Sequence, residues 1–151
     1  MGEQTLRIVR ITDGQGQAEQ SRWLAAAERV HRQLRPQLPA DYLQKMRDVF
    51  GGGGEMCVSA RGDRVVGVAV FRVFENTHVG RRFYVDDLVT DEAERSSGAG
   101  RALLDHLETV ARARGCPGLD LESGTQRTRA HHFYFRQGYF ITAFSFRKEF
   151  R

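Results

Sequence analysis

The spacing of apolar residues changes along the chain, and each change marks an element. Apolar positions recur at helical spacing in four segments, which predicts helices over residues 21–34, 41–50, 98–114 and 128–137. Short runs rich in β-branched and aromatic residues predict strands over residues 5–11, 56–61, 64–74, 82–90 and 119–122, and one strand or a pair of strands over 139–150. This order predicts an α/β fold with a mixed (α+β) sheet and helices on both faces, in a single domain covering residues 1–151.

The first predicted helix carries a titratable residue in its apolar stripe. Leu24, Ala27, Val30 and Leu34 share one face of that helix, and His31 falls on the same face. The periodicity therefore assigns His31 to the buried side of the helix.

Composition and charge favour a soluble globular protein with an anionic ligand. The chain has 151 residues, of which 40% are hydrophobic and 28% charged, with a formal net charge of +4. All but two of its 23 basic residues are arginine, the exceptions being Lys45 and Lys148. Arginine suits phosphate and carboxylate groups because its planar guanidinium donates paired hydrogen bonds.

Several protein classes are excluded at this stage. No apolar run approaches the roughly 20 residues of a membrane-spanning helix, and the first segment lacks the order of a signal peptide. We therefore expect a cytoplasmic protein without a membrane partner. Cys57 and Cys116 stand alone, which predicts reduced thiols and no metal site.

A glycine-rich turn between a strand and an amphipathic helix is the strongest local motif. It reads Arg95-Ser96-Ser97-Gly98-Ala99-Gly100-Arg101. Its glycines allow several backbone N–H groups to converge at the positive end of the helix dipole, which predicts an anion site. A nucleotide P-loop would need a lysine after the last glycine, where this chain has Arg101. A dinucleotide fingerprint would need a third glycine, where this chain has Leu103, so neither motif is matched.

Two segments together resemble a known family. Arg95-x-x-Gly98-x-Gly100 is similar to the acyl-CoA pyrophosphate signature of the GNAT superfamily of N-acyltransferases, and the segment from Ala130 to Tyr139 is similar to that family's second conserved motif. The resemblance implies a central mixed sheet of about six to seven strands flanked by about four helices. It also implies acetyl-CoA as co-substrate, held by the residues of the turn and by the end of the preceding strand: Leu88, Val89, Arg95, Ser96, Ser97, Gly98, Ala99, Gly100 and Arg101.

Acetyl transfer to an amine needs a proton donor for the leaving thiolate and a carboxylate for the amine. The resemblance places Tyr134 beside the sulfur of CoA as general acid. Asp86 and Asp87 interrupt an otherwise apolar strand, and either can act as base or as an amine-binding carboxylate. Adjacent strand residues point to opposite faces, and we favour Asp87 as the one that faces the cleft. A structural alternative pairs the two with Arg81 or Arg82.

Three further positions bear on binding. We expect Glu122 and Ser123, which end the next strand, to contact the substrate. Many members of the family that this chain resembles have an asparagine that positions CoA, and this chain has Arg127 in its place. The sequence does not decide whether Arg127 makes the same contact with CoA.

These residues predict an acetyl-CoA-dependent N-acetyltransferase acting on a small cationic amine or a protein amino group. One alternative is an acyl-CoA-binding regulatory domain without turnover. The other is a basic nucleic-acid-binding module, against which the even spread of arginines counts. A homodimer through the aromatic C-terminal strand is a further expectation.

Overall fold

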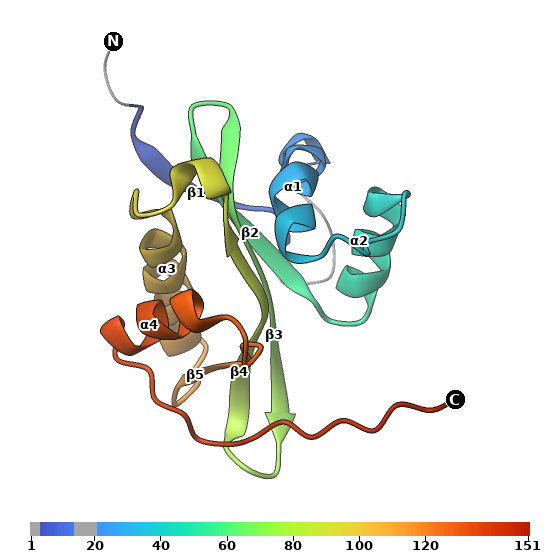
Figure 1. Cartoon of the computed structure of the whole chain (residues 1–151), viewed down its shortest axis with the longest axis vertical. Helices are drawn as coiled ribbons and strands as arrows, with labels where there is room; N and C mark the ends of the chain where they lie inside the picture. Colours follow the sequence, from blue (N-terminus) through green and yellow to red (C-terminus); the bar gives the residue numbers. More distant parts are fainter. Residues whose placement is uncertain (1–3, 14–20) are drawn as a thin grey trace. The chain divides into compact units, whose positions relative to one another are not determined.

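The computed structural model describes residues 4–13 and 21–151, and its elements follow the predicted order (Figure 1). The strands are β1 (Leu6–Arg10), β2 (Glu55–Arg61), β3 (Arg64–Asn76), β4 (Gly80–Thr90) and β5 (Leu119–Leu121). The helices are α1 (Ser21–Leu34), α2 (Tyr42–Gly51), α3 (Ala99–Ala113) and α4 (Thr128–Arg136), with a short 3-10 turn, η1 (Glu92–Glu94). The chain divides into two compact units, Met1–Asp120 and Leu121–Arg151.

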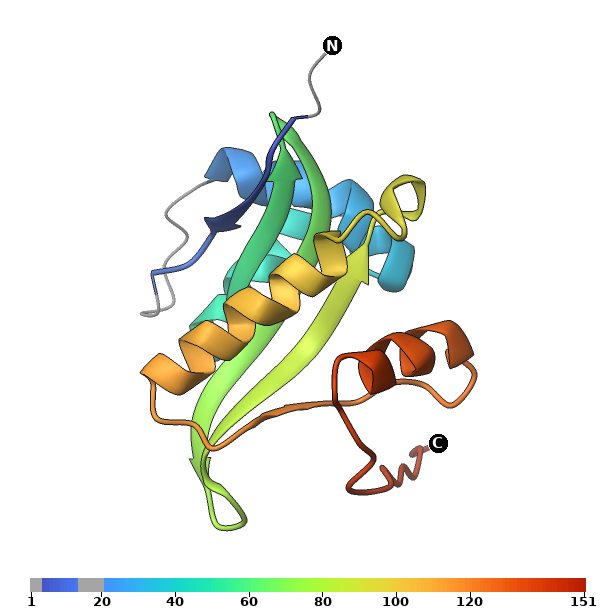
Figure 2. The same cartoon turned by 90° about the vertical axis from the view of Figure 1, so that its left-hand side faces the viewer.

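The first unit is built on the sheet. Its strands lie in the order β1-β2-β3-β4-β5, and the first four pair antiparallel in succession. Helices α1 and α2 cover one face and α3 crosses the other, as Figures 1 and 2 show. The mixed α/β fold is confirmed, but the described residues form five strands, so the expected six to seven was too high.

Each face of the sheet has its own buried layer. On the α1 and α2 side, Val30, Tyr42 and Phe50 pack with Val58 and Val68 of the central strands. On the opposite side, α3 buries Leu103, Leu104 and Leu107. Full burial of such a side chain contributes about 2 kcal/mol, so both helix layers fix the sheet and the turns at its ends.

A β-bulge interrupts β4 at the acidic pair. Val70 of β3 lies opposite Asp87, but the next residue, Phe71, lies opposite Val85. Asp86 is therefore the extra residue on the bulged strand. Bulges redirect side chains and end regular pairing, and they are frequent beside active sites.

The second unit contains α4 and the segment that follows it. Residues 137–151 form neither helix nor strand, so the predicted strand over 139–150 is wrong for this structure. The alternating pattern is there, but a strand forms only when a neighbour accepts and donates its backbone hydrogen bonds. No helix in residues 4–13 or 21–151 is long and apolar enough to cross a membrane.

Candidate functional site

The glycine turn has the backbone geometry of an anion site. Ser96 and Gly98 both adopt left-handed conformations, with φ of 64° and 87°. Gly98 is the N-cap of α3, and because it has no side chain, no side-chain hydrogen bond caps the first N–H groups of that helix. The chain thus presents uncapped N–H groups at the positive end of a 15-residue helix.

Ion pairs anchor the turn on both sides. The guanidinium of Arg61 donates to the Ser97 carbonyl at 3.1 Å and lies 3.3 Å from the Glu94 carboxylate. Just upstream, the buried Asp91 carboxylate accepts from Arg29 at 2.8 Å and from Arg64 at 3.0 Å. These contacts hold the turn against the ends of β2 and β3, so its N–H groups are preorganised.

Two observations test whether a pyrophosphate fits the turn. The hydroxyl oxygen of Ser97 is buried and has no hydrogen-bond partner in the part of the chain that the structure describes. A Cβ built on Gly98 meets no atom within 4 Å, so the space over the turn is open. The flanking side chains of Arg95 and Arg101 are 49% and 70% exposed, and their ion pairs with Glu92 and Asp105 are long, at 3.7 and 3.8 Å. The residues present therefore fit a pyrophosphate group.

The Asp87 carboxylate is engaged at both oxygens by α1 and the residue after it. Nε2 of His31 lies 2.7 Å from Oδ2, and because a carboxylate only accepts, this nitrogen donates. Nε of Arg35 donates to Oδ1 at 2.8 Å. Burial alone raises the pKa of Asp87, but the hydrogen bonds and charges of His31 and Arg35 outweigh it and hold the pKa below its usual value.

Asp86 is paired with a different arginine. Arg72 of β3 donates two hydrogen bonds of 2.8 Å to the Asp86 carboxylate, and Arg35 donates to the Asp86 carbonyl at 3.3 Å. The Asp86 side chain is 31% exposed and that of Asp87 only 14%. The alternative that pairs the acidic residues with arginines is thus borne out in kind, but the arginines are Arg72 and Arg35, and Arg82 bonds Asp120 instead, at 2.8 Å.

A buried polar chain extends from Asp87 into the core. His31, 2% exposed, places Nδ1 2.9 Å from the hydroxyl of Tyr42, which is itself 2% exposed. Sequence reasoning placed His31 on the buried face but missed its role. The signal that points to it is a titratable residue in an apolar helical stripe, since such a group must find a polar partner once buried.

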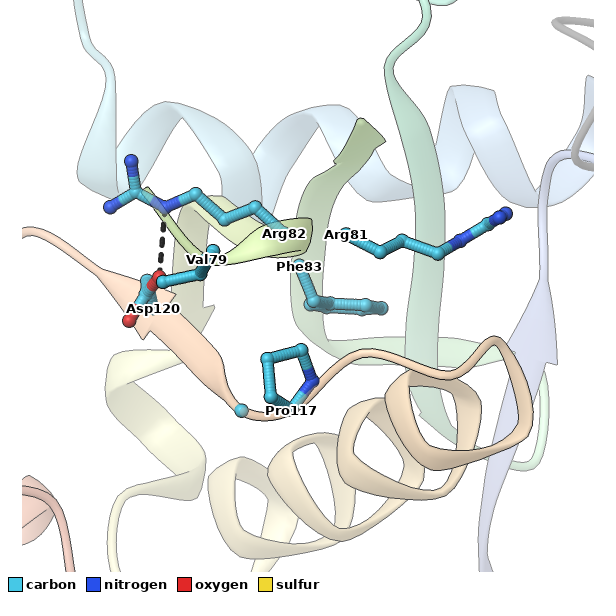
Figure 3. A pocket seen from close by; sticks show the side chains of 7 residues that line it. Val79, Arg81, Arg82, Phe83, Pro117 and Asp120 are labelled. Carbon is cyan, nitrogen blue, oxygen red and sulfur yellow. Dashed lines mark hydrogen bonds and ion pairs between the residues drawn. The ribbon is translucent and has the colours of Figure 1, made fainter. Parts of the chain in front are cut away.

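Two small pockets lie elsewhere in the first unit. One, of about 200 Å³, lies where β4 begins, and Figure 3 shows Arg82 reaching to Asp120 while Arg81 points away from it. Its floor includes Phe83 and Pro117. The other, of about 270 Å³, lies against α3 beside Cys57 and His106. Neither is lined by the glycine turn or by the acidic pair.

Both cysteines are buried and free, as expected. Burial raises the pKa of Cys57 to about 12, so its thiol is protonated and unreactive at neutral pH.

The second unit holds the predicted proton donor. Tyr134 lies on α4 with its ring 5.5 Å from that of Phe133 and 5.8 Å from that of Tyr139. Burial raises the pKa of Tyr134, against the opposing charge of Arg127, so its hydroxyl keeps its proton at neutral pH. Arg127 is the N-cap residue of α4. Glu122 and Ser123 follow β5, where Glu122 is exposed and Ser123 half-buried.

The anchoring carboxylates predict a loss of stability in acid. Hydrogen bonds from Arg29, opposed by burial, hold the pKa of Asp91 well below its usual value. The stability that ionised Asp91 contributes is therefore complete above the unfolded-state pKa of about 3.9, shrinks below it, and is lost only as pH falls through the lower folded-state pKa. Asp91→Asn should cost about 2 kcal/mol at pH 7, or roughly 6 °C in Tm, and the difference from the wild type should narrow steadily as pH falls below about 4.

Asp63→Asn is the matched control in the same thermal unfolding series. The Asp63 side chain is 84% exposed, and its ion-pair partner among the described residues is the exposed Arg22. This variant should follow the wild-type pH profile throughout. A gap between Asp91→Asn and wild type that does not narrow as pH falls below about 4 would show that Asp91 does not stabilise the fold as an anion.

Comparison with known proteins agrees with this geometry. A profile of the Acetyltransferase (GNAT) family matches residues 20–139. The uncharacterized N-acetyltransferase YhdJ of Bacillus subtilis (strain 168) is 36% identical over 94 residues, which cover 52% of this chain and 66% of that protein.

Solved structures show a similar fold. The ribosomal-protein-alanine N-acetyltransferase from Brucella melitensis biovar Abortus 2308 superposes with a TM-score of 0.79 at 16% identity, over 97% of this chain and 100% of that chain. The enzyme AAC(6')-Iy, in complex with a bisubstrate analogue, CoA-S-monomethyl-acetylneamine, superposes with a TM-score of 0.77 at 12% identity, over 97% and 99% of the two chains. At these identities the likeness concerns the fold.

Proposed function

Because the chain belongs to the acetyltransferase (GNAT) family, we propose that it transfers the acetyl group of acetyl-CoA to a primary amine, either a small cationic amine or a protein amino group. The observation that carries this proposal is the turn from Arg95 to Arg101, with its left-handed Gly98, uncapped helix N-terminus and unpartnered Ser97 hydroxyl. These features suit the pyrophosphate of acetyl-CoA.

The proposed contacts to acetyl-CoA divide between two elements. Backbone N–H groups from Ser96 to Gly100 bind the pyrophosphate, the Ser97 hydroxyl donates to it, and Arg95 and Arg101 add charge from the rim. The main chain of Leu88 and Val89, near the end of β4, pairs with the pantetheine arm and polarises the thioester carbonyl.

In the proposed reaction the amine nitrogen attacks the thioester carbon directly. A C–N bond forms, the C–S bond breaks, and the CoA sulfur takes a proton from the Tyr134 hydroxyl as it leaves. The ammonium first loses one proton to water, which makes the protonation state of the amine the main barrier at neutral pH, and the nitrogen loses a second proton to water as the C–N bond forms. Solvent then restores the Tyr134 proton.

The environment of the acidic pair bears on its role. A carboxylate whose pKa is lowered takes a proton from an ammonium poorly, so Asp87 suits amine binding better than base catalysis. Asp86 is the more exposed of the two, and we assign it to the first contact with the amine, with Asp87 behind it. Glu122 and Ser123 are proposed as further substrate contacts.

An amine panel tests the proposal. Acetyl-CoA is incubated with the protein and with diamines, an aminoglycoside, an amino sugar, a peptide α-amine or an uncharged aromatic amine, and thiol release is followed. We expect the highest kcat/KM with amines that are cationic at neutral pH and at least about tenfold less with the aromatic amine. Acetyl-CoA-dependent stabilisation without thiol release from any amine would instead indicate a regulatory binding domain.

A further inference from the structure

On β3 and β4, the guanidinium of Arg72 is held by one carboxylate and two aromatic rings. Its Nε and one of its terminal nitrogens donate to the two oxygens of Asp86, each at 2.8 Å. Its Cζ lies over the rings of Phe74 and Tyr84, 5.6 Å from each centroid. A carboxylate and aromatic faces both attract positive charge, so this arrangement binds an organic cation. We call Asp86, Phe74 and Tyr84 together the cation site.

The pairing of β3 with β4 brings these side chains together. Arg72 and Phe74 stand two residues apart on β3 and share a face, and Tyr84 lies directly opposite Arg72 on β4. Asp86 is the extra residue of the bulge, and its carboxylate reaches Arg72 on this face. Val70, two residues before Arg72, belongs to the core that α1 and α2 cover. The cation site therefore continues the α1 and α2 face of the sheet.

The bulge also brings both acidic residues to that face. Asp87 bonds His31 of α1, while Asp86 bonds Arg72. The alternation expected for adjacent strand residues is therefore wrong at this point, because the bulge adds a residue to β4. Asp86 stands two residues before Leu88, so the cation site lies about 7 Å along the strand from the main chain that we assign to the pantetheine arm.

The Arg72 side chain lies where water can reach it. It is 44% exposed, and the Asp86 side chain is 31% exposed. An ion pair between exposed side chains contributes little, because water solvates both charges once they separate. Asp87 differs, since it is 14% exposed and accepts hydrogen bonds at both oxygens. A cation arriving from solvent can therefore take the place of Arg72 on Asp86 at small cost.

We propose that the ammonium group of the amine substrate binds in the cation site in place of Arg72, whose guanidinium is a competitor built into the chain. This inference rests on the proposed function and adds the substrate class that the site selects, an alkylammonium. Its charge binds Asp86, and its methylene groups lie against Phe74 and Tyr84. Arg72 thereby sets the amine concentration at which the site fills.

Steady-state kinetics of Arg72→Ala test the competition. This variant should lower KM for a cationic amine about tenfold and leave kcat within about twofold, because the competitor affects binding and not bond formation. KM for the uncharged aromatic amine should not fall. Arg72→Lys keeps a cation beside Asp86 and should stay close to the wild-type KM. Adding Asp86→Asn to Arg72→Ala should remove the gain. A higher KM in Arg72→Ala would overturn the proposal.

Arg82→Ala is the matched control. The Arg82 guanidinium also lies over the Tyr84 ring, 4.9 Å from its centroid, but it bonds Asp120 and not Asp86. This variant likewise frees a carboxylate beside the same ring. Its KM for the cationic amine should stay within about twofold of wild type. A tenfold fall in both arginine variants would contradict a specific role for Asp86.

Binding of 1,4-diaminobutane without acetyl-CoA tests the site independently of turnover. In an NMR titration of the full chain labelled with 15N, the Nε–H signal of Arg72, assigned with Arg72→Lys, should move as the diamine displaces it from Asp86. The Kd should be about tenfold lower in Arg72→Ala. An Arg72 signal that does not move in the saturated wild type, or equal Kd values, would overturn the proposal. Tighter binding without acetylation of any amine would uphold the cation site and refute the proposed function.

Discussion

Gly98→Val should raise the Kd for acetyl-CoA at least about 100-fold, equivalent to roughly 3 kcal/mol, the worth of one or two charge-assisted hydrogen bonds. Gly98 has φ of 87° and open space over its Cβ position. A valine there extends into the space that the proposed pyrophosphate occupies. It also disfavours the left-handed conformation that directs the neighbouring N–H groups at the anion. Isothermal titration calorimetry with acetyl-CoA measures the effect.

Gly115→Val is the matched control for that experiment. Gly115 follows α3 at its other end, with φ of 72° and likewise no atom within 4 Å of its Cβ position. Both variants should therefore lose a similar stability, about 1–2 kcal/mol, from the strained backbone. Only Gly98→Val should lose acetyl-CoA. Equal affinities in the two variants would place the pyrophosphate elsewhere.

Tyr134→Phe should lower kcat about 100-fold or more while leaving the Kd for acetyl-CoA within about twofold of wild type. Its hydroxyl keeps its proton at neutral pH because burial raises its pKa, as a general acid requires. Removing the hydroxyl forces the thiolate to leave unprotonated or to take its proton from water. Steady-state thiol release at saturating acetyl-CoA measures this loss.

Tyr139→Phe separates chemistry from packing. The two tyrosine rings are neighbours, with centroids 5.8 Å apart, so both substitutions remove a hydroxyl from the same aromatic group. Tyr139→Phe should retain most of the wild-type kcat. If the two variants lose turnover equally, Tyr134 acts through packing and not as the proton donor.

Local patterns predicted most of the elements well. The spacing of Leu103, Leu104 and Leu107 predicted α3, and the structure buries all three. The glycine turn was equally predictable, because left-handed backbone at Gly98 depends on the residue itself and on its immediate neighbours. Such features are encoded within a few consecutive positions.

Contacts between distant segments were not predictable in the same way. The His31 and Arg35 contacts to Asp87 join positions more than 50 residues apart, and they arise from the packing of α1 on the sheet. The bulge at Asp86 likewise depends on the register of β4 against β3. The aromatic segment 139–150 has the composition of a strand, but pairing needs a partner that the pattern of one chain does not name.

The central claim is tested most directly by a mass balance of acetyl transfer. Acetyl-CoA carrying an isotopically labelled acetyl group is incubated with the protein and the best amine of the panel, and both products are measured by mass spectrometry. The account predicts one labelled N-acetyl amine for each CoA thiol released, with both products lost in Gly98→Val. Thiol release without acetylated amine, or no consumption of acetyl-CoA with any amine, would contradict it.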